Sequence, residues 1–242
     1  MQNPIDVPTR ETVAFLAPYL RPGADVVEVG CGDGHVASEL MRRGYGVIGV
    51  DSDPTAAARA QERGVRAEVA NWPAYDGPAV DAIVYTRSLH HINPLRGAIR
   101  RSRELVRPAG SLLVEDFAFD ETNEATINWF LGVLRSQAGK AHVNPVHGAF
   151  ATTLLQSDDP VLDWDRDHAH ELHTVAAMKV AIAEHFTVTA TQSVPYLYRY
   201  LIPVLSETAQ AAAFVDHVLQ EEAELGKGGD IVLVGRRIVG TA

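Results

Sequence analysis

The sequence predicts an α/β fold in which one parallel sheet carries helices on both faces. Short β-branched apolar runs alternate with longer segments of helical spacing, and a glycine-rich turn follows the first apolar run. The runs are hydrophobic on both faces, as buried parallel strands are. Strand–helix–strand alternation implies right-handed crossovers, which place helices on both sides of the sheet.

Each element of the first half follows from this pattern and from the capping and proline residues at its boundaries. The helical spacing of 9–20 predicts a helix that covers one sheet edge. Asp53-Pro54 and Asn93-Pro94 each place a capping side chain before a proline that suits a first helical turn. We expect strands at 24–30, 45–51, 65–70, 80–86 and 110–117, and helices between them at 33–43, 53–63 and 94–107.

After Phe117 the alternation stops. Residues 118–175 contain helix-compatible pieces but no strand–helix unit, so we interpret them as an insertion that caps the substrate crevice of a single domain, 1–242. The expected elements that complete the sheet are a helix at 174–185, a strand at 186–194, a helix at 207–225 and a strand at 229–238. The apolar stripe of the helix at 207–225 predicts packing on the sheet.

Composition narrows the class of function. Thirty-one acidic against twenty-one basic residues give a formal charge of −10, which disfavours binding to nucleic acid phosphates and favours a small-molecule substrate. No apolar run approaches the roughly 18 residues needed to span a bilayer, and the start of the chain does not resemble a signal peptide, so no membrane partner and a cytoplasmic location are expected. The single cysteine, Cys31, excludes an internal disulfide and a multi-cysteine zinc site.

The strongest local signal is VVEVGCGDGHVASEL, residues 26–40, in which a strand runs through Gly30, Gly32 and Gly34 into a helix. Glycines let the backbone turn sharply and approach a ligand, and the helix N-terminus presents unpaired N–H groups. Asp51, twenty-one residues after Gly30, ends the second strand, where a carboxylate can accept hydrogen bonds from both ribose hydroxyls. The loop and Asp51 therefore predict a ligand that carries a nucleoside. The alternative is that Asp51 is a solvated turn residue or a helix cap.

The spacing of the glycines separates two kinds of ligand. Nicotinamide dinucleotides and S-adenosylmethionine both bind such loops, but the dinucleotide fingerprint places its third glycine at position 35. That position is His35, and the third glycine is Gly34. A nicotinamide-dependent oxidoreductase is therefore disfavoured.

Four stretches, VEVGCGDG, GVDSDP, VDAIVYTRSLHHI and LVRPAGSLLVEDF, occur in the order and approximate spacing of a known family. With them the sequence resembles the class I S-adenosylmethionine-dependent methyltransferases, particularly the small-molecule group related to the ubiquinone and menaquinone methyltransferases. The resemblance covers 24–117 well and the last two strands loosely. It implies a Rossmann-like, doubly wound, seven-stranded sheet of order 3-2-1-4-5-7-6 with the last strand antiparallel.

The resemblance also implies which residues bind S-adenosylmethionine. In that family the acid that matches Glu28 and the glycine loop lie near the methionine part and the ribose. The acid that matches Asp51 holds the ribose, and the residue after the third strand, here near Asn71, meets the adenine. In this sequence the third strand and the residues after it read AEVANWPAYDG, which departs from the family's usual pattern, although Trp72 could cover the adenine ring. The cofactor residues expected are Glu28, Gly30, Cys31, Gly32, Gly34, Asp51, Ser52, Asn71, Trp72, Thr86 and Arg87.

Methyl transfer from a sulfonium requires that the nucleophile, the methyl carbon and the sulfur be aligned and that water be excluded. If the acceptor is a hydroxyl group, a base within hydrogen-bond reach helps the reaction. His90, His91 and Asp116 follow the fourth and fifth strands, at the edge where an open α/β sheet binds ligands, and are the catalytic candidates. The alternative is that the histidines are structural. Strand alternation sends only one of Glu115 and Asp116 towards the crevice.

Two further segments carry open alternatives. DWDRDHAHELH, 163–173, is dense in metal-binding donor atoms but matches no metal motif, so no metal is predicted and a solvated loop is favoured. PYLYRYL, 195–201, would place Tyr196, Tyr198 and Tyr200 on one side if extended, facing either an aromatic acceptor or the core.

The sequence therefore predicts an enzyme that transfers a methyl group from S-adenosylmethionine to a small organic acceptor. The alternative is a non-catalytic S-adenosylmethionine-binding protein with a regulatory or assembly role. The methylated atom and the oligomeric state have no signature in the sequence.

Overall fold

The computed structural model describes residues 3–242, which form two compact units. The sheet unit comprises Thr9–Phe117, His173–Gln192 and Arg236–Ala242, and the helical unit comprises residues 3–8, 118–172 and 193–235. Each unit has its own buried residues. That the segment 118–175 caps a substrate crevice stays a prediction.

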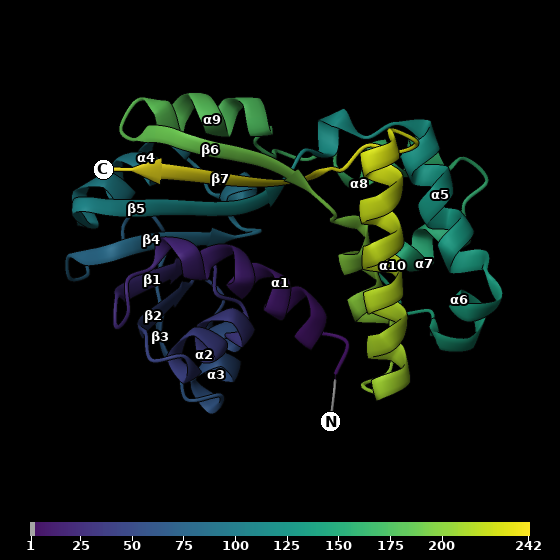
Figure 1. Ribbon diagram of the computed structural model, residues 1–242, viewed down its shortest axis with the longest axis horizontal. Helices are drawn as coiled ribbons and strands as arrows, with labels where there is room; N and C mark the ends of the chain where they lie inside the picture. The colour runs from purple at the N-terminus through teal and green to yellow at the C-terminus, as the bar shows by residue number, and fades with distance from the viewer. Residues whose placement is uncertain (1–2) are drawn as a thin grey trace. The chain divides into compact units, whose positions relative to one another are not determined.

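The sheet has seven strands in the order β3-β2-β1-β4-β5-β7-β6, the last antiparallel, as predicted (Figure 1). The registers of β1 with β2 and β4, of β2 with β3 and of β4 with β5 are parallel. The carboxyl ends of these strands therefore share one sheet edge. The strands are β1 Asp25–Val29, β2 Gly46–Asp51, β3 Arg66–Val69, β4 Val80–Thr86, β5 Val106–Phe117, β6 Thr187–Val194 and β7 Gly235–Thr241.

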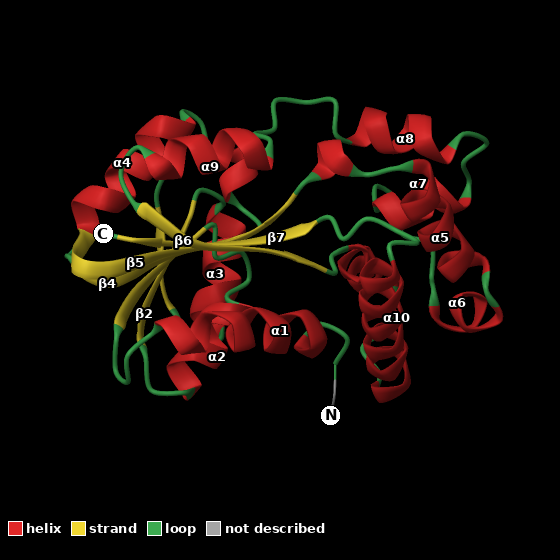
Figure 2. Ribbon diagram, turned by 45° about the horizontal axis from the view of Figure 1, so that its top comes forward, coloured by secondary structure: helices red, strands yellow, loops and turns green. Residues whose placement is uncertain are grey.

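Helices cover both faces of this sheet (Figure 2). On one face lie α1 Asp6–Leu16, α2 His35–Arg42 and α3 Pro54–Glu62, and on the other lie α4 Leu95–Leu105 and α9 Val175–Ala183. Leu16 of α1 belongs to the same buried cluster as Val26, Val84 and Leu113 of the central strands. The first helix thus covers a face, and its predicted place at the sheet edge is wrong because its apolar side has the central strands to pack on.

The starts of α3 and α4 differ: α3 begins at Pro54, whereas α4 begins one residue after Pro94. Asp53 Oδ1 accepts a hydrogen bond from the Thr55 backbone N–H at 2.8 Å, so the predicted cap of α3 is confirmed. In α4 the N-cap residue is Pro94 itself, and no side chain caps the helix. The predicted Asn93 cap is therefore wrong.

The helical unit contains most of the predicted insertion. Its helices are α5 Glu124–Arg135, α6 Gln137–His142, α7 Phe150–Leu155, α8 Pro160–Asp167 and α10 Ala209–Gly228, with short 3₁₀ helices η3 Phe119–Glu121 and η4 Leu197–Val204. The main packing partners of α10 are η4 and α6. The predicted packing of this helix on the sheet is wrong, because its apolar stripe, including Phe214 and Val218, is buried within the helical unit.

The tyrosine-rich segment 195–201 is not extended. A buried carboxylate of α10, Glu222, accepts hydrogen bonds from the backbone N–H groups of Tyr196, Leu197 and Tyr198 at 2.6, 3.0 and 3.1 Å. These bonds satisfy N–H groups that the start of η4 leaves without intrahelical partners. The single-sided row of tyrosines expected for an extended strand is therefore replaced by a helical turn.

The acid- and histidine-rich segment 163–173 lies at the end of α8. His168 is buried, with Nδ1 2.8 Å from the Trp164 carbonyl oxygen and Nε2 3.0 Å from the Tyr200 hydroxyl. Both ring nitrogens are thus engaged within an aromatic cluster. Across residues 3–242, no three His, Cys, Asp or Glu side chains are grouped so as to hold a metal ion, so the geometry gives the metal hypothesis no support.

The last strand begins later than predicted. The expected strand was 229–238, but its residues 229–234 lie outside β7; α10 ends at Gly228 and its C-cap is Gly229, whose φ is +81°. The Val232 N–H then donates to Thr126 Oγ1 at 2.8 Å, and the Val234 carbonyl accepts from the Ala118 N–H at 2.7 Å. These backbone groups are unavailable for a ladder, so β7 starts at Gly235.

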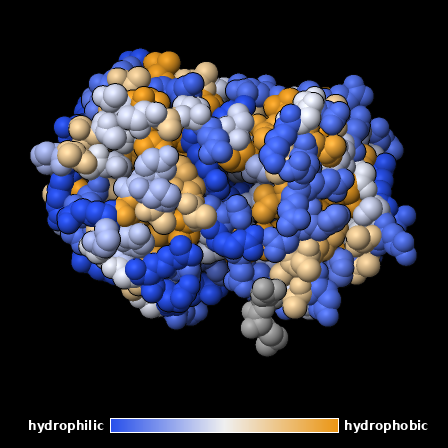
Figure 3. Space-filling model, in the orientation of Figure 1, coloured by the Kyte–Doolittle hydropathy of each residue, from blue (hydrophilic) through white to orange (hydrophobic). Residues whose placement is uncertain are grey.

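Polar and apolar residues intermingle on the molecular face seen in Figure 3. The large apolar side chains exposed among the described residues include Val69 on β3 and Val180 on α9. Of the helices formed within residues 3–242, none combines the length and apolar character required to cross a bilayer.

Candidate functional site

The sheet unit contains a pocket of about 450 Å³ at the carboxyl ends of its parallel strands. Its wall comes from the segments that follow four neighbouring strands, β1 to β4. This is where an open α/β sheet places its ligand crevice. The lining residues are Val29, Gly30, Val50, Asp51, Ser52, Ala70, Asn71, Trp72, Arg87, Ser88, His91, Ile92 and Asn93.

The glycine loop is held against the sheet by its backbone. The N–H groups of Gly30 and Cys31 donate to the Val50 carbonyl at 2.7 and 3.2 Å. Gly30 has a φ of +69°, and a Cβ there would collide with Ser88, whose hydroxyl donates to the Val29 carbonyl at 2.5 Å. Gly30 is thus required by both its conformation and its neighbour.

Asp51 lies at the end of β2, half-buried in the pocket wall. Its Oδ2 accepts a hydrogen bond from the Gly32 N–H at 2.8 Å, and its Oδ1 accepts one from the Asp53 N–H at 2.9 Å. A carboxylate oxygen can accept about two hydrogen bonds. The side chain is therefore oriented by the loop and keeps acceptor capacity for a ligand's hydroxyl groups.

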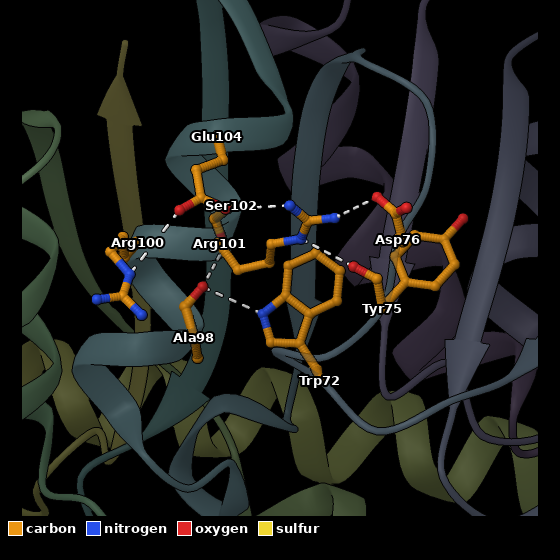
Figure 4. A network of polar contacts seen from close by, with 8 residues as sticks. All are labelled: Trp72, Tyr75, Asp76, Ala98, Arg100, Arg101, Ser102 and Glu104. Carbon is orange, nitrogen blue, oxygen red and sulfur yellow. Dashed lines mark hydrogen bonds and ion pairs between the residues drawn. The ribbon is translucent and has the colours of Figure 1, made fainter.

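Trp72 forms a buried part of the wall, next to the exposed Asn71. Figure 4 shows its indole N–H directed at the Ala98 carbonyl of α4, 3.1 Å away, and its ring beside Tyr75 at a centroid distance of 5.8 Å. Arg101 of α4 binds the same loop, donating to the Tyr75 carbonyl at 2.8 Å and to Asp76 at 2.9 Å. The loop after β3 is thus fastened to α4, which fixes the pocket wall.

Glu28 is the penultimate residue of β1 and is 1% exposed. Its Oε1 accepts a hydrogen bond from Thr86 Oγ1 at 2.6 Å, whereas Oε2 has no well-formed hydrogen bond. Burial disfavours the ionised carboxylate and raises the pKa of Glu28 to about 7, against the opposing effects of Thr86 and Arg87.

The two candidate histidines occupy different environments. His90 is buried, and its Nδ1 lies 2.6 Å from Oδ1 of Asp116, which is fully buried. His91 is exposed and lines the pocket, and its ring centroid is 4.0 Å from that of His90. The turn η2, Leu89–His91, therefore brings only His91 to the pocket wall and leaves His90 and Asp116 behind it.

Glu115 and Asp116 are both buried and neither lines the pocket, so the expectation that one of them faces it is not met. Glu115 accepts hydrogen bonds from Thr12 Oγ1 at 2.6 Å and from Arg237 Nε at 2.8 Å. Glu115 thus forms a structural ion pair with Arg237 within the sheet unit, whereas Asp116 contacts His90.

Several of the sequence-predicted residues meet at the pocket: Gly30, Asp51, Ser52, Asn71, Trp72, Arg87 and His91. The others are not among its lining residues: Glu28, Cys31, Gly32, Gly34, Thr86, His90 and Asp116. Gly34 serves packing, since a Cβ there would lie 2.8 Å from Ala60 Cβ of α3. Burial raises the pKa of the Cys31 thiol to about 12, which suits a buried filler rather than a nucleophile.

Sequence reasoning missed Val29, Val50, Ala70, Ser88, Ile92 and Asn93. The first three lie within the last two residues of the expected strands 24–30, 45–51 and 65–70, so these strand ends were predicted but the residues were not assigned to the pocket. Ser88, Ile92 and Asn93 border the short turn η2, for which the sequence has no clear signal.

Comparison with known proteins places this geometry in a family. A family model described as "Methyltransferase domain" matches residues 5–159. An uncharacterized methyltransferase of Mycobacterium bovis is 39% identical over 99 residues, which cover 38% of this chain and 50% of that protein. A ubiquinone biosynthesis O-methyltransferase of Azorhizobium caulinodans is 30% identical over 105 residues, covering 39% and 42%. The chain thus spans about half the length of these curated relatives.

Solved structures share the fold. The S-adenosylmethionine dependent methyltransferase of Mesorhizobium loti superposes with a TM-score of 0.58 at 15% identity, covering 97% of this chain and 98% of that one. The geranyl diphosphate C-methyltransferase of Streptomyces coelicolor superposes with a TM-score of 0.57, also at 15% identity, covering 96% and 78%. Because the family model matches more than half of the 242 residues and the sheet has the class I strand order, the chain belongs to the class I methyltransferase family.

Proposed function

We propose that this protein transfers a methyl group from S-adenosylmethionine to a small organic acceptor by direct displacement. The observation that carries the proposal is the pocket at the carboxyl ends of β1, β2, β3 and β4, where Asp51 is oriented by the glycine loop and retains acceptor capacity. Asp51 and Ser52 would hold the ribose, and Asn71 and Trp72 would border the adenine. Gly30 and the segment from Arg87 to His91 would contact the methionine part of the donor and the acceptor.

Calorimetry with S-adenosylhomocysteine and with NAD, followed by a screen of metabolite pools with methyl-labelled donor, tests the proposal. We expect S-adenosylhomocysteine to bind, NAD not to bind, and label to appear in a small molecule. Binding without any labelled product would favour the non-catalytic alternative. Binding of NAD in place of S-adenosylhomocysteine would contradict the proposal.

Replacing Asp51 by Ala is expected to weaken S-adenosylhomocysteine binding by about 1–3 kcal/mol, because a charged hydrogen-bond acceptor for the ribose is lost. Asp51→Asn keeps one acceptor oxygen and should lose less. The matched control is Asp33→Ala on the same loop, whose carboxylate pairs with Arg59 outside the pocket. Calorimetric affinity unchanged by Asp51→Ala would contradict the ribose role.

His91 is the base that the geometry favours for a hydroxyl acceptor, since it lines the pocket while His90 is buried against Asp116. We expect His91→Ala to lower kcat by about 100-fold for such an acceptor, as removal of a general base does, and to leave S-adenosylhomocysteine affinity unchanged. Steady-state kinetics over a range of pH would check this. A pH profile of kcat that is identical in the variant and the wild type would exclude His91 as the base.

A further inference from the structure

Arg87 places a positive charge in the pocket wall, directly after β4. Other arginines of the sheet unit are paired: Arg59 with Asp33, Arg101 with Asp76 and Arg237 with Glu115. The guanidinium of Arg87 forms no hydrogen bond or ion pair with any side chain or carbonyl within residues 3–242. The positive charge of Arg87 acts on the buried carboxyl group of Glu28 and opposes the rise of its pKa, but the N–H donors of this half-buried guanidinium are available to a ligand.

The backbone of Arg87 is held in an unfavourable conformation. Its φ is +63°, in the left-handed region where a non-glycine side chain is strained, and its N–H donates to the Glu115 carbonyl at 2.7 Å. Glycine would occupy this position without strain, yet the chain carries a large charged residue here. Strain of this kind is concentrated at ligand-binding and catalytic positions.

The charges in the pocket require an anion. A bound sulfonium donor adds a second positive charge to the cavity that holds Arg87, and two cations in one cavity repel. Asp51 is turned towards the N–H groups of Gly32 and Asp53. The buried Glu28 has a pKa raised by burial to about 7, so it supplies an incomplete negative charge. Asp51 carries one negative charge and Glu28 only part of one, against the two positive charges of Arg87 and the sulfonium, so a further anion on a ligand would complete the balance.

We propose that Arg87 selects the methyl acceptor through a carboxylate group on that acceptor. A guanidinium presents two parallel N–H donors that match the two oxygens of a carboxylate. The donor's own carboxylate is the other possible source, but the adjacent ammonium group of the methionine part already balances its charge. The inference rests on the proposed function, since it assigns the acceptor class for the same pocket.

The first test separates the two carboxylates. S-adenosylhomocysteine carries the amino-acid group, whereas 5′-methylthioadenosine lacks it. The expected contact of Arg87 with the methionine part is through its backbone, which Arg87→Met keeps, so we expect the variant to bind both compounds within about twofold of the wild type. If Arg87→Met instead loses S-adenosylhomocysteine affinity by tenfold or more and keeps that for methylthioadenosine, Arg87 binds the donor and the proposal is overturned.

The second test measures acceptor preference on protein saturated with S-adenosylhomocysteine. The probes are acetate, benzoate, phenylacetate and 4-hydroxybenzoate, each paired with its primary amide. A charge-assisted pair predicts that the wild type binds at least one acid about tenfold more tightly than its amide. Arg87→Met should reduce that ratio to within about twofold, and Arg87→Lys, which keeps the charge but not the fork, should retain part of it.

Arg63→Met is the matched control, because Arg63 is an exposed arginine that follows α3 outside the pocket. It should leave every affinity unchanged. Equal binding of acids and amides by the wild type, or an acid preference that survives in Arg87→Met, would overturn the inference. A wild-type protein that fails to bind S-adenosylhomocysteine would instead refute the proposed function, so the two failures are distinguishable.

Discussion

Replacing Trp72 by Ala is expected to destabilise the protein by about 3–5 kcal/mol, the range for removing a buried tryptophan from a packed core. The indole is 7% exposed and packs beside Tyr75 and edge-on to Tyr85, at centroid distances of 5.8 and 6.3 Å. The lost hydrogen bond contributes little, since the Ala98 carbonyl still accepts one from Ser102 Oγ at 3.0 Å. The cavity left by the ring therefore dominates the effect.

Urea unfolding at equilibrium would measure this loss. Trp72→Phe is the matched variant, because it keeps an aromatic ring and removes the N–H group, and it should cost about 1.5 kcal/mol or less. Because Trp72 also lines the pocket, we expect the Ala variant to bind S-adenosylhomocysteine more weakly under conditions in which it is still folded. A variant as stable as the wild type would show that the contacts of Trp72 with α4 and its neighbours, drawn in Figure 4, contribute little to stability.

The parts of the site that sequence predicts are those with a local physical requirement. Gly30 is needed for a positive φ and for the space beside Ser88, and Asp51 ends a strand beside the glycine loop, so motif and structure agree. His90 and His91 are equivalent in sequence. Only the turn η2 and the contact with Asp116 separate them, and neither has a local signal.

The errors in the fold have a common cause in long-range contacts. For residues 195–201 the sequence left the conformation open, and it is decided by Glu222, more than twenty residues later, which accepts the N–H groups at the start of η4. The late start of β7 likewise depends on Thr126 and Ala118, over a hundred residues earlier. Local propensity cannot register partners at such separations, because tertiary contacts override it.

Glu28 predicts a dependence of stability on pH. Its pKa is about 7 in the folded protein and 4.5 ordinarily, so the folded state retains a proton that the unfolded chain releases. A raised carboxyl pKa contributes stability that is fully present below the unfolded pKa and is lost as pH rises through the folded one. The shift amounts to about 3 kcal/mol between pH 4 and pH 8, as an upper value for a fully buried group.

Glu28→Gln should remove this contribution, since an amide does not ionise and its carbonyl oxygen can still accept from Thr86 Oγ1. Urea unfolding of both proteins at pH 5 and pH 8 would show the variant gaining up to about 3 kcal/mol relative to the wild type at the higher pH. Any constant cost of the amide cancels in that difference.

Glu222 of the helical unit also has a pKa raised to about 7 by burial, so a shared slope of stability against pH remains in both proteins. Glu62→Gln, at an exposed glutamate of α3, is the control that should leave the slope unchanged. Parallel pH profiles for Glu28→Gln and the wild type would mean that the β1 carboxylate is ionised in the fold, and that Arg87 or a bound cation already compensates its charge.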